Sequence, residues 1–164
     1  MIPERRQARF LVTGAQGFIG SSLCRSLQAQ GDAVRAVIRR PGAGAWIQSV
    51  TCDLGNDPLP TSVMEGIDGV FHLAGVAHVQ DIARIPNAVY RRVNVDATIE
   101  LLAAALDKGV KRFVYFSSVK AAADPGEHCV DEAWDAPPTD AYGESKREAE
   151  QQVLSAGRQS GMHV

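Results

Sequence analysis

Residues 9–20, RFLVTGAQGFIG, decide the fold, because a short apolar run passes through a turn with three glycines into an amphipathic stretch. Gly14 permits a tight turn after the strand, Gly17 leaves room for a pyrophosphate, and Gly20 lets the helix pack closely on the strand. The helix N-terminus presents unpaired N–H groups and the positive end of its dipole to a phosphate. Because the glycines lie between a strand and a helix, they predict a dinucleotide-binding turn.

Short apolar runs alternate with amphipathic stretches along the rest of the chain. The runs are too continuous for strands with one face in water, so they indicate parallel strands with helices on both faces. Strands are predicted at 9–13, 33–39, 46–51, 69–73 and 112–117, and helices at 18–30, 86–108 and 139–158. The predicted fold class is therefore α/β, a three-layer, doubly wound parallel sheet of Rossmann type that forms one domain over residues 1–164.

The predicted helix 86–108 is apolar on more than one side, whereas a helix outside a sheet needs a single apolar face. Either this helix has a broad core face, or its outer side packs against a second subunit. The two sides consist of Val89, Val93, Ala97, Leu101 and Ala105, and of Val95, Ile99, Leu102 and Leu106.

The composition is that of an ordinary globular protein, since 45% of the 164 residues are hydrophobic and 22% are charged. The net charge of −2 and the lack of long runs of like charge argue against a nucleic-acid partner or a membrane surface. The apolar stretches are far shorter than a membrane span. Three widely spaced cysteines form no ligand pattern, so we predict no metal and expect reduced thiols in a cytoplasmic protein.

Two arginines, Arg39 and Arg40, stand at the end of the second predicted strand. An acidic residue at this point would bind the ribose diol of NAD, but the nearby Asp32 precedes the strand. Guanidinium groups suit a 2′-phosphate, which they bind in a bidentate manner. The expected coenzyme is therefore NAD(P), with Arg39 favouring NADP; the alternative is a pair of solvated surface arginines.

Tyr142 and Lys146 lie four residues apart, on one face of the last predicted helix. The Lys146 ammonium would stabilise a Tyr142 phenolate, which could exchange a proton with a substrate hydroxyl or carbonyl. The strand before this helix ends in Ser117 and Ser118, at the edge where open parallel sheets bind ligands. Ser118, Tyr142 and Lys146 are therefore the predicted catalytic residues, and a coenzyme would carry the hydride.

The motifs together resemble the extended short-chain dehydrogenase/reductases, the NAD-dependent epimerase/dehydratase family. The similarity is greatest to sugar-nucleotide 4-epimerases and 4-keto-reductases, which implies hydride transfer at C4 of a nucleotide-linked, UDP-type sugar. The matching segments cover nearly the whole chain: TGAQGFIG at 13–20, Asp53-Leu54, HLAG at 72–75, Asn94-Val95, KRFVYFSSVKA at 111–121 and YGESKREAE at 142–150.

The resemblance implies roles for residues that spacing alone does not single out. Asp53 is implied to bind the adenine amino group, with Leu54 beside the ring, and Asn94 to brace the site from the central helix. With Arg39, these three join a predicted cofactor-binding set of Gly14, Gln16, Gly17, Phe18, Ile19, Gly20, Leu73, Ala74, Gly75, Ser117, Tyr142 and Lys146.

Family members continue beyond the point that corresponds to residues 162–164, where a sixth strand should begin. A C-terminal substrate domain is therefore expected to be absent from this chain. Helices 86–108 and 139–158 correspond to helices that often pair with a second subunit, which implies a homodimer. Ala121-Ala122-Ala123 replaces a Val-Tyr-Gly type of turn, so the loop on the substrate side is expected to differ.

Other chemically notable residues are expected to have structural roles. His72 is interpreted as a hydrogen-bonded core histidine and Trp46 as a packing residue, whereas His78 either faces a substrate or lies in a surface loop. The acidic loop residues Asp131, Glu132 and Asp135 lack companion metal ligands. Two other functions stay open: reduction of a non-sugar carbonyl, such as a steroid or flavonoid ketone, and dinucleotide binding without catalysis.

Overall fold

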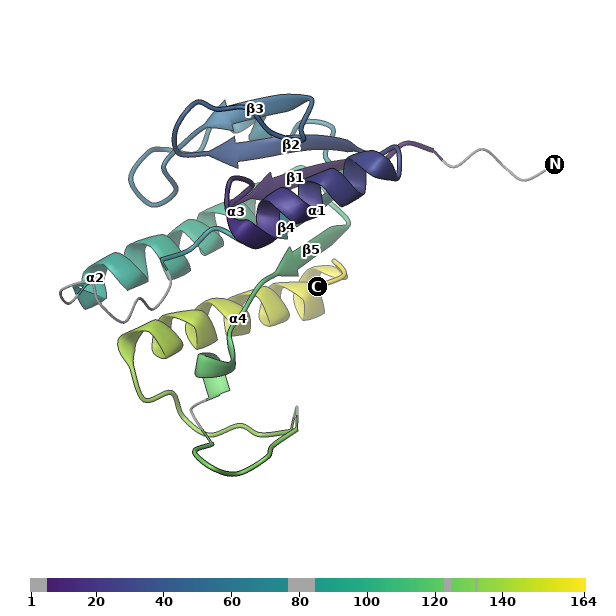
Figure 1. The fold of residues 1–164 in the computed structure, drawn as a ribbon. Helices are drawn as coiled ribbons and strands as arrows, with labels where there is room; N and C mark the ends of the chain where they lie inside the picture. The colour runs from purple at the N-terminus through teal and green to yellow at the C-terminus, as the bar shows by residue number, and fades with distance from the viewer. Residues whose placement is uncertain (1–5, 77–84, 123–124, 132) are drawn as a thin grey trace.

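The computed structural model describes residues 6–76, 85–122, 125–131 and 133–164. Its centre is an all-parallel sheet in the order β3-β2-β1-β4-β5, which confirms the predicted α/β class (Figure 1). Strands are added on one side of β1 as far as β3, and then on its other side from β4 onward. Ligands are therefore expected at the carboxyl ends of β1 and β4, where the strand order reverses. The strands are β1 (Arg9–Thr13), β2 (Ala33–Ile38), β3 (Gln48–Thr51), β4 (Gly69–His72) and β5 (Arg112–Tyr115).

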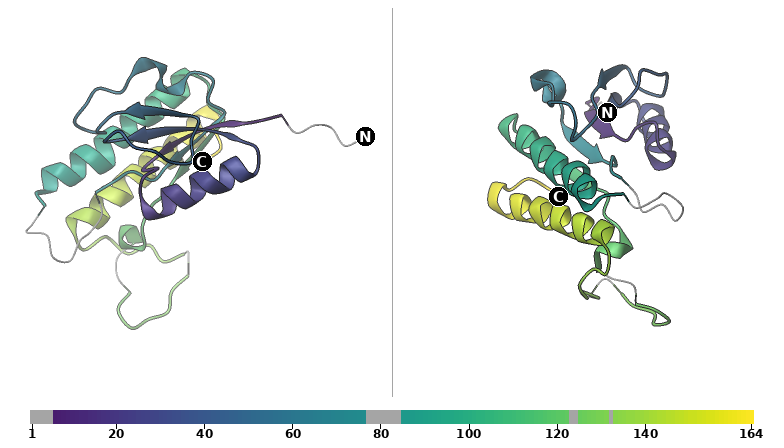
Figure 2. Two further views of the ribbon diagram at one scale, coloured as in Figure 1. Left: turned by 45° about the horizontal axis from the view of Figure 1, so that its top comes forward. Right: turned by 90° about the vertical axis from the view of Figure 1, so that its left-hand side faces the viewer.

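Helices cover both faces of the sheet, as the continuous apolar strands predict. Helix α1 (Phe18–Ala29) lies on one face, and α3 (Ala97–Asp107) and α4 (Ala141–Ser160) lie side by side on the other (Figure 2). Each face has its own core. The core under α3 and α4 includes Phe113, Leu101 and Val153, and the core under α1 includes Cys24, Leu27 and Val34.

The predicted helix 86–108 is interrupted, which the apolar pattern does not indicate. It consists of α2 (Asn87–Tyr90), a π-helical segment η2 (Arg91–Asp96) and then α3. The Thr98 hydroxyl donates to the Asn94 carbonyl at 2.7 Å, and so competes for an acceptor that a regular α-helix uses. Such π turns are frequent at functional sites.

The other boundaries differ from the predictions by a few residues. Helix α4 begins at the Asp140 cap, whose carboxylate accepts the Gly143 N–H at 2.7 Å, and it ends at Gly161 with a φ of 75°. Two short 3₁₀ turns, η1 (Thr61–Met64) and η3 (Val119–Ala122), complete the connections. His163 forms a parallel bridge with Arg112 beside β5, where the sixth strand was expected.

The second apolar side of the central helix is divided between core and solvent. Val95 and Leu102 are buried, so they belong to a broad core face. Ile99 and Leu106 are 38% and 36% exposed, on the side away from the sheet. A broad core face therefore explains the buried residues of this side. Packing against a second subunit could account only for the two exposed apolar side chains.

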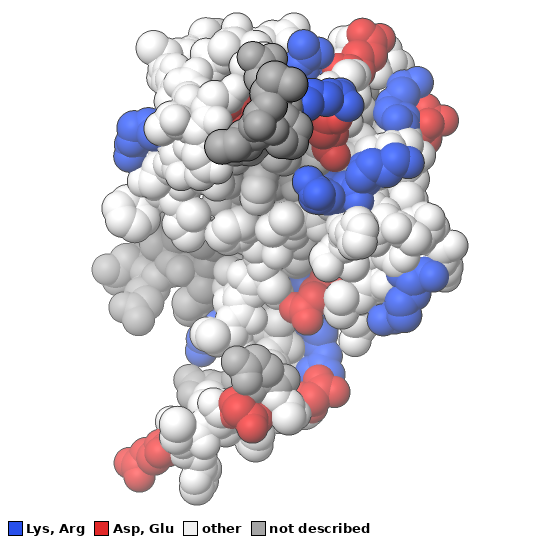
Figure 3. Space-filling model, turned by 90° about the vertical axis from the view of Figure 1, so that its right-hand side faces the viewer, with Lys and Arg blue, Asp and Glu red and all other residues white. Residues whose placement is uncertain are grey.

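Charges of both signs are mixed on one face of the molecule. On the face in Figure 3, basic and acidic side chains alternate, and the described residues form no extended patch of one sign. None of the helices in the described part of the chain has both the length and the apolar character that crossing a membrane requires.

Candidate active site

A cleft of about 350 Å³ opens at the carboxyl ends of β1, β4 and β5, where the sheet order predicts a ligand. The glycine turn forms one wall, and the start of α4 forms the opposite wall. The cleft is lined by Gly14, Gly17, Phe18, Ile19, Gly20, Leu73, Gly75, Val76, Phe116, Ser117, Tyr142 and Lys146.

The glycine turn has the geometry that a pyrophosphate requires. Gly14 has a φ of 68°, and a Cβ there would lie 2.9 Å from the Ala74 nitrogen. A Cβ at Gly20 would overlap the Gly14 carbonyl oxygen, so the close contact of helix and strand needs a glycine. Within the described structure no side chain caps the N-terminus of α1, so its first N–H groups remain available to an anion. These features fit a dinucleotide.

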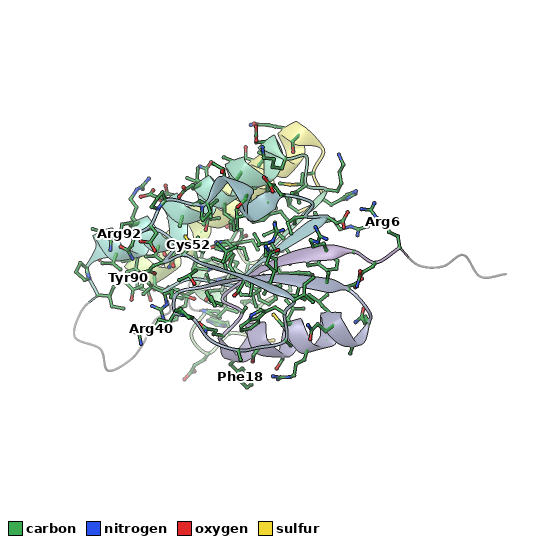
Figure 4. All side chains as sticks on the ribbon, turned by 90° about the horizontal axis from the view of Figure 1, so that it is seen from above. Arg6, Phe18, Arg40, Cys52, Tyr90 and Arg92 are labelled. Atoms are coloured by element: carbon green, nitrogen blue, oxygen red, sulfur yellow. The ribbon has the colours of Figure 1, made fainter. Side chains whose placement is uncertain are left out.

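Two apolar side chains at the start of α1 are exposed beside this turn. Phe18 is 92% exposed and Ile19 is 54% exposed, and Phe18 projects away from the sheet (Figure 4). The backbone of the turn, rather than these side chains, therefore provides the polar groups that face the cleft.

Lys146 is buried at the base of the cleft. Its Nζ donates to the Phe116 carbonyl at 2.6 Å and lies 4.1 Å from the centre of the Tyr115 ring. Burial lowers the pKa of Lys146 to about 8, although the Glu150 carboxylate acts in the opposite direction. The Tyr142 ring, one helical turn earlier, packs 6.0 Å from the Tyr90 ring. The predicted tyrosine and lysine thus share the cleft with the glycine turn.

Replacing Lys146 by Met is expected to raise the free energy of unfolding by about 3 kcal/mol at pH 7, since each pKa unit corresponds to about 1.4 kcal/mol. The folded pKa of about 8 lies below the ordinary 10.5, so the unfolded chain binds the extra proton between these pH values. The buried ammonium therefore destabilises the parent fully below pH 8, and this cost disappears as the pH rises towards 10.5. Urea denaturation at pH 7 and pH 10 measures the difference.

The matched control for this prediction is Lys111→Met, because Lys111 is exposed. This variant is expected to show no such pH-dependent gain. A Lys146→Met protein that is less stable than the parent at pH 7 would show that the contacts with Phe116 and Tyr115 outweigh the cost of burying the charge.

The structure places Ser117, rather than Ser118, on the cleft lining. The Ser117 hydroxyl donates to Glu150 at 2.5 Å. The Ser118 hydroxyl accepts the Lys120 N–H at 3.2 Å, and so stabilises the 3₁₀ turn η3. Strand β5 ends at Tyr115, two residues before this pair of hydroxyls, so the chain has already turned when it reaches Ser118.

The adenosine-side candidates surround the carboxyl ends of β2 and β3. Arg39 and Arg40 are exposed directly after β2, and Gln16 donates to the Arg40 carbonyl at 3.1 Å. Asp53 accepts the Asn56 amide at 2.9 Å, and the neighbouring Leu54 is buried. Figure 4 shows Arg40 and Tyr90 at the same end of the sheet, opposite Arg6.

Asn94 lies in the π-helical segment behind the cleft. Its side chain accepts the Val76 N–H at 2.8 Å, and donates to the Val76 carbonyl at 3.1 Å and to the Ser145 hydroxyl at 3.0 Å. Asn94 therefore joins the chain after β4 to helix α4. Of the predicted site residues, those that the structure describes outside the cleft lining are Gln16, Arg39, Asp53, Leu54, Ala74, Asn94 and Ser118.

Sequence reasoning missed two lining residues, Val76 and Phe116. Val76 directly follows HLAG, and Phe116 lies within the KRFVYFSSVKA segment, directly after β5, so the available signal was proximity to a strand end. His72 is a hydrogen-bonded core residue, as predicted, and Trp46 packs against the core under α1.

The remaining residues that were set aside have no described role in the cleft. His78, Ala123 and Glu132 lie outside the described residues. In the described part of the chain no group of three acidic, histidine or cysteine side chains could hold a metal ion. Asp135 instead forms an ion pair with Arg147. The three cysteines are free.

Comparison with known proteins agrees with the geometry. The model of the NAD dependent epimerase/dehydratase family matches residues 10–164. The chain belongs to this family.

Individual relatives of this family member differ in the substrates that their names state. A Synechocystis protein provisionally named a dihydroflavonol 4-reductase is 38% identical over 92% of this chain and 45% of its own length. The UDP-glucose 4-epimerase of Vibrio cholerae is 34% identical over 94% of this chain and 48% of its own. The structure of MoeE5 with UDP-glucose and NAD superposes with a TM-score of 0.78, at 35% identity over 92% of this chain and 49% of that one. The chain thus spans about half the length of these relatives.

Proposed function

We propose that this chain is the coenzyme-binding part of an NAD(P)-dependent epimerase or reductase that acts at C4 of a nucleotide-linked sugar. The observation that carries the proposal is the placement of Tyr142 and Lys146 in the same cleft as the glycine turn. The relatives of this chain include an enzyme named for UDP-glucose and a structure that holds UDP-glucose with NAD.

The proposed chemistry assigns one task to each side chain. A bound coenzyme would supply the hydride acceptor and donor. Tyr142 would take a proton from the C4 hydroxyl, or return one to the C4 oxygen. Lys146 would favour the phenolate form of Tyr142 through its ammonium charge. An epimerase would use both directions of this proton transfer at one oxygen, and a reductase would use only the return.

The contribution of Ser118 would be to position the substrate oxygen, as the family resemblance implies. Ser118 lies in the turn that packs against the start of α4, and its hydroxyl holds the Lys120 N–H. Ser117 lines the cleft together with Tyr142, whereas Ser118 is outside the lining. Either hydroxyl could orient the C4 oxygen, and the lining favours Ser117.

A second function is supported by a specific relative. The provisionally named dihydroflavonol 4-reductase is 38% identical to this chain, so reduction of a non-sugar ketone by the same residues is the alternative. A dinucleotide-binding module without catalysis is a further alternative, which the joint presence of Tyr142 and Lys146 in the cleft argues against.

The experiment that tests the proposal is a substrate panel with the full-length protein. UDP-glucose, UDP-glucuronic acid and UDP-N-acetylglucosamine are each incubated with NAD and, separately, with NADP, and the products are separated by chromatography. A 4-epimer from at least one sugar is the expected result. If no UDP-sugar reacts but a flavonoid or steroid ketone oxidises NADPH, the alternative function is correct.

We further propose that Arg39 gives the coenzyme site a preference for NADP. Its exposed guanidinium directly follows β2, and the hydrogen bond from Gln16 to the Arg40 carbonyl ties this segment to the glycine turn. Arg39→Ala is expected to weaken NADPH binding about tenfold and leave NADH binding unchanged, because one ionic hydrogen bond to the 2′-phosphate is lost. Fluorescence titration measures both dissociation constants.

Arg25→Ala is the control for this pair of titrations, because Arg25 is exposed on α1 and its guanidinium donates to Ser22. If Arg39→Ala affects NADPH and NADH equally, Arg39 is a solvated surface residue and the preference is refuted. The MoeE5 structure holds NAD, so the preference would distinguish this chain from that relative.

The proposed assembly is a homodimer through the segments 86–108 and 139–158. Exposed apolar side chains support it on both helices: Ile99 and Leu106 on α3, and Leu154 on α4, are 36–41% exposed. The substrate domain is proposed to follow this coenzyme-binding domain in the full-length protein. The free cysteines are in keeping with the proposed cytoplasmic location.

A further inference from the structure

A chain of buried hydrogen bonds runs from the glycine turn to the start of the catalytic helix. The Thr13 hydroxyl lies 2.7 Å from Nδ1 of His72, and Nε2 of His72 lies 2.8 Å from the Thr98 hydroxyl. Thr98 donates to the Asn94 carbonyl at 2.7 Å. The Asn94 side chain reaches Ser145 at 3.0 Å, and Ser145 donates to the Tyr142 carbonyl at 2.7 Å.

The side chains in this polar chain, those of Thr13, His72, Thr98, Asn94 and Ser145, are each at most 5% exposed. Water cannot replace a lost partner at such positions, so each broken hydrogen bond leaves a costly unsatisfied group. The polar chain therefore resists distortion along its whole length.

The neighbouring backbone determines where each proton lies. The Thr13 oxygen accepts the N–H groups of Leu73 at 3.2 Å and Ala74 at 3.0 Å, so both of its acceptor positions are used. Its hydrogen must then go to Nδ1 of His72. The proton of neutral His72 consequently resides on Nε2 and is donated to Thr98, whose own hydrogen goes to the Asn94 carbonyl.

His72 must also be neutral for this arrangement. A second proton, on Nδ1, would point at the hydroxyl hydrogen of Thr13. That hydrogen has no acceptor other than Nδ1 in the hydrogen bonds described above. Burial, reinforced by the Lys146 ammonium, lowers the pKa of His72 to about 3. The imidazole therefore accepts on one side and donates on the other, and it links two segments that are 59 and 26 residues away in sequence.

We propose that His72 is a positioning residue for the proposed reaction, with Nδ1 holding the glycine turn through Thr13 and Nε2 holding the π-helical turn of Asn94 through Thr98. The first contact fixes the end of β1 directly before Gly14. The second fixes the segment that braces Ser145 and the Tyr142 turn. Because this rests on the proposed function, its test includes readouts that need no sugar substrate.

Two variants separate the two arms of the imidazole. In His72→Asn the side-chain oxygen replaces Nδ1, which keeps the Thr13 contact and removes the Thr98 contact. In His72→Gln the longer amide replaces Nε2, which keeps the Thr98 contact and removes the Thr13 contact. His72→Asn is expected to reduce kcat about 30-fold with coenzyme affinity within about threefold of the parent, because the proton-transfer group is misplaced. His72→Gln is expected to weaken coenzyme binding about tenfold with kcat within about threefold.

Thr98→Val provides an independent test of the Nε2 arm, and it should reproduce the result of His72→Asn. The direct test of the proton arrangement is the ¹⁵N spectrum of the histidine side chains in the full-length protein at pH 7. His72 is expected to show the signature of a neutral ring protonated at Nε2. A ring protonated at Nδ1 would overturn the proposal. It would also be overturned if both variants changed kcat and coenzyme affinity together, in proportion to their loss of Tm.

If the full-length protein turns over no nucleotide sugar, the proposed function fails but the proposal on His72 is still decided. The ring signature and the contrast in coenzyme affinity between His72→Asn and His72→Gln need only the coenzyme. The positioning role is supported if the ¹⁵N spectrum shows a neutral His72 ring protonated at Nε2 and if only His72→Gln binds the coenzyme more weakly than the parent. Equal affinities in both variants contradict it.

Discussion

A Gly17→Asp variant is expected to bind NADH and NADPH at least about 100-fold more weakly than the parent, because like charges brought together cost several kcal/mol. Gly17 is the residue before α1, with a φ of −76° and a ψ of 171°, and it lines the cleft. A carboxylate here would occupy the N–H groups of the helix N-terminus and repel a pyrophosphate from them. Fluorescence titration of the reduced coenzymes measures the loss.

The fold of this variant should survive, which makes the result interpretable. The backbone at Gly17 is in the extended region that any residue adopts, and Asp is among the best N-cap residues. A new Cβ would lie 3.1 Å from the Gly14 oxygen, which requires a small local adjustment. The Tm of Gly17→Asp is therefore expected to stay close to that of the parent.

Ser22→Asp is the matched control, since it adds the same charge to an exposed position of the same helix, outside the cleft lining. It should leave both dissociation constants within about twofold of the parent values, because an exposed charge at this distance is screened by salt. Unchanged affinity in Gly17→Asp would show that phosphates do not bind at the glycine turn.

The sheet and the glycine turn could be predicted because their signals are local. A run such as RFLVT at 9–13 is apolar without alternation, and Gly20 is required by its contact with Gly14 in the same turn. The structure confirms the all-parallel sheet and the helix that begins at Phe18. Strands β2 to β5 are one or two residues shorter than predicted, because hydrogen bonding to neighbouring strands decides where a strand begins and ends, and a single apolar run does not reveal this bonding.

The π-helical segment could not be predicted, because the polar contacts around it join residues that are far apart in sequence. The hydroxyl of Thr98 contacts His72, which is 26 residues away in sequence, and the Asn94 carbonyl on its own helix. Apolar periodicity reports which side of a helix is buried, and it carries no information about a polar contact of this kind. The prediction of one regular helix over 86–108 was wrong for this reason.

Which of the two serines lines the cleft could not be predicted from the sequence, for a related reason. Ser117 and Ser118 are equivalent in a pattern that only states that a strand ends nearby. Which hydroxyl faces the cleft depends on how the chain turns into η3, where Ser118 is held by Lys120. Spacing within a helix is more informative, since Tyr142 and Lys146 both line the cleft.

Replacing Tyr142 by Phe is expected to reduce turnover by the full-length protein about 10³-fold, within the range that general acid–base groups contribute. The change removes only the hydroxyl that would exchange a proton with the C4 oxygen. The ring would keep its contact with Tyr90, so coenzyme affinity and Tm should remain close to the parent values. Steady-state kinetics and coenzyme titration, measured side by side, separate catalysis from binding.

Tyr115→Phe is a closely matched control, because it also removes one phenol hydroxyl, from a ring whose centre lies 4.1 Å from Nζ of Lys146. The Tyr115 hydroxyl is buried and has no hydrogen-bond partner in the described structure, and burial raises its pKa. Its ring face, which supports the Lys146 ammonium, remains in Phe. Turnover of Tyr115→Phe is expected within about threefold of the parent, and its stability should be equal or higher because an unsatisfied buried group is removed. If Tyr142→Phe retained activity at the level of Tyr115→Phe, another group would have to carry the proton, and Tyr142 would lose its proposed role.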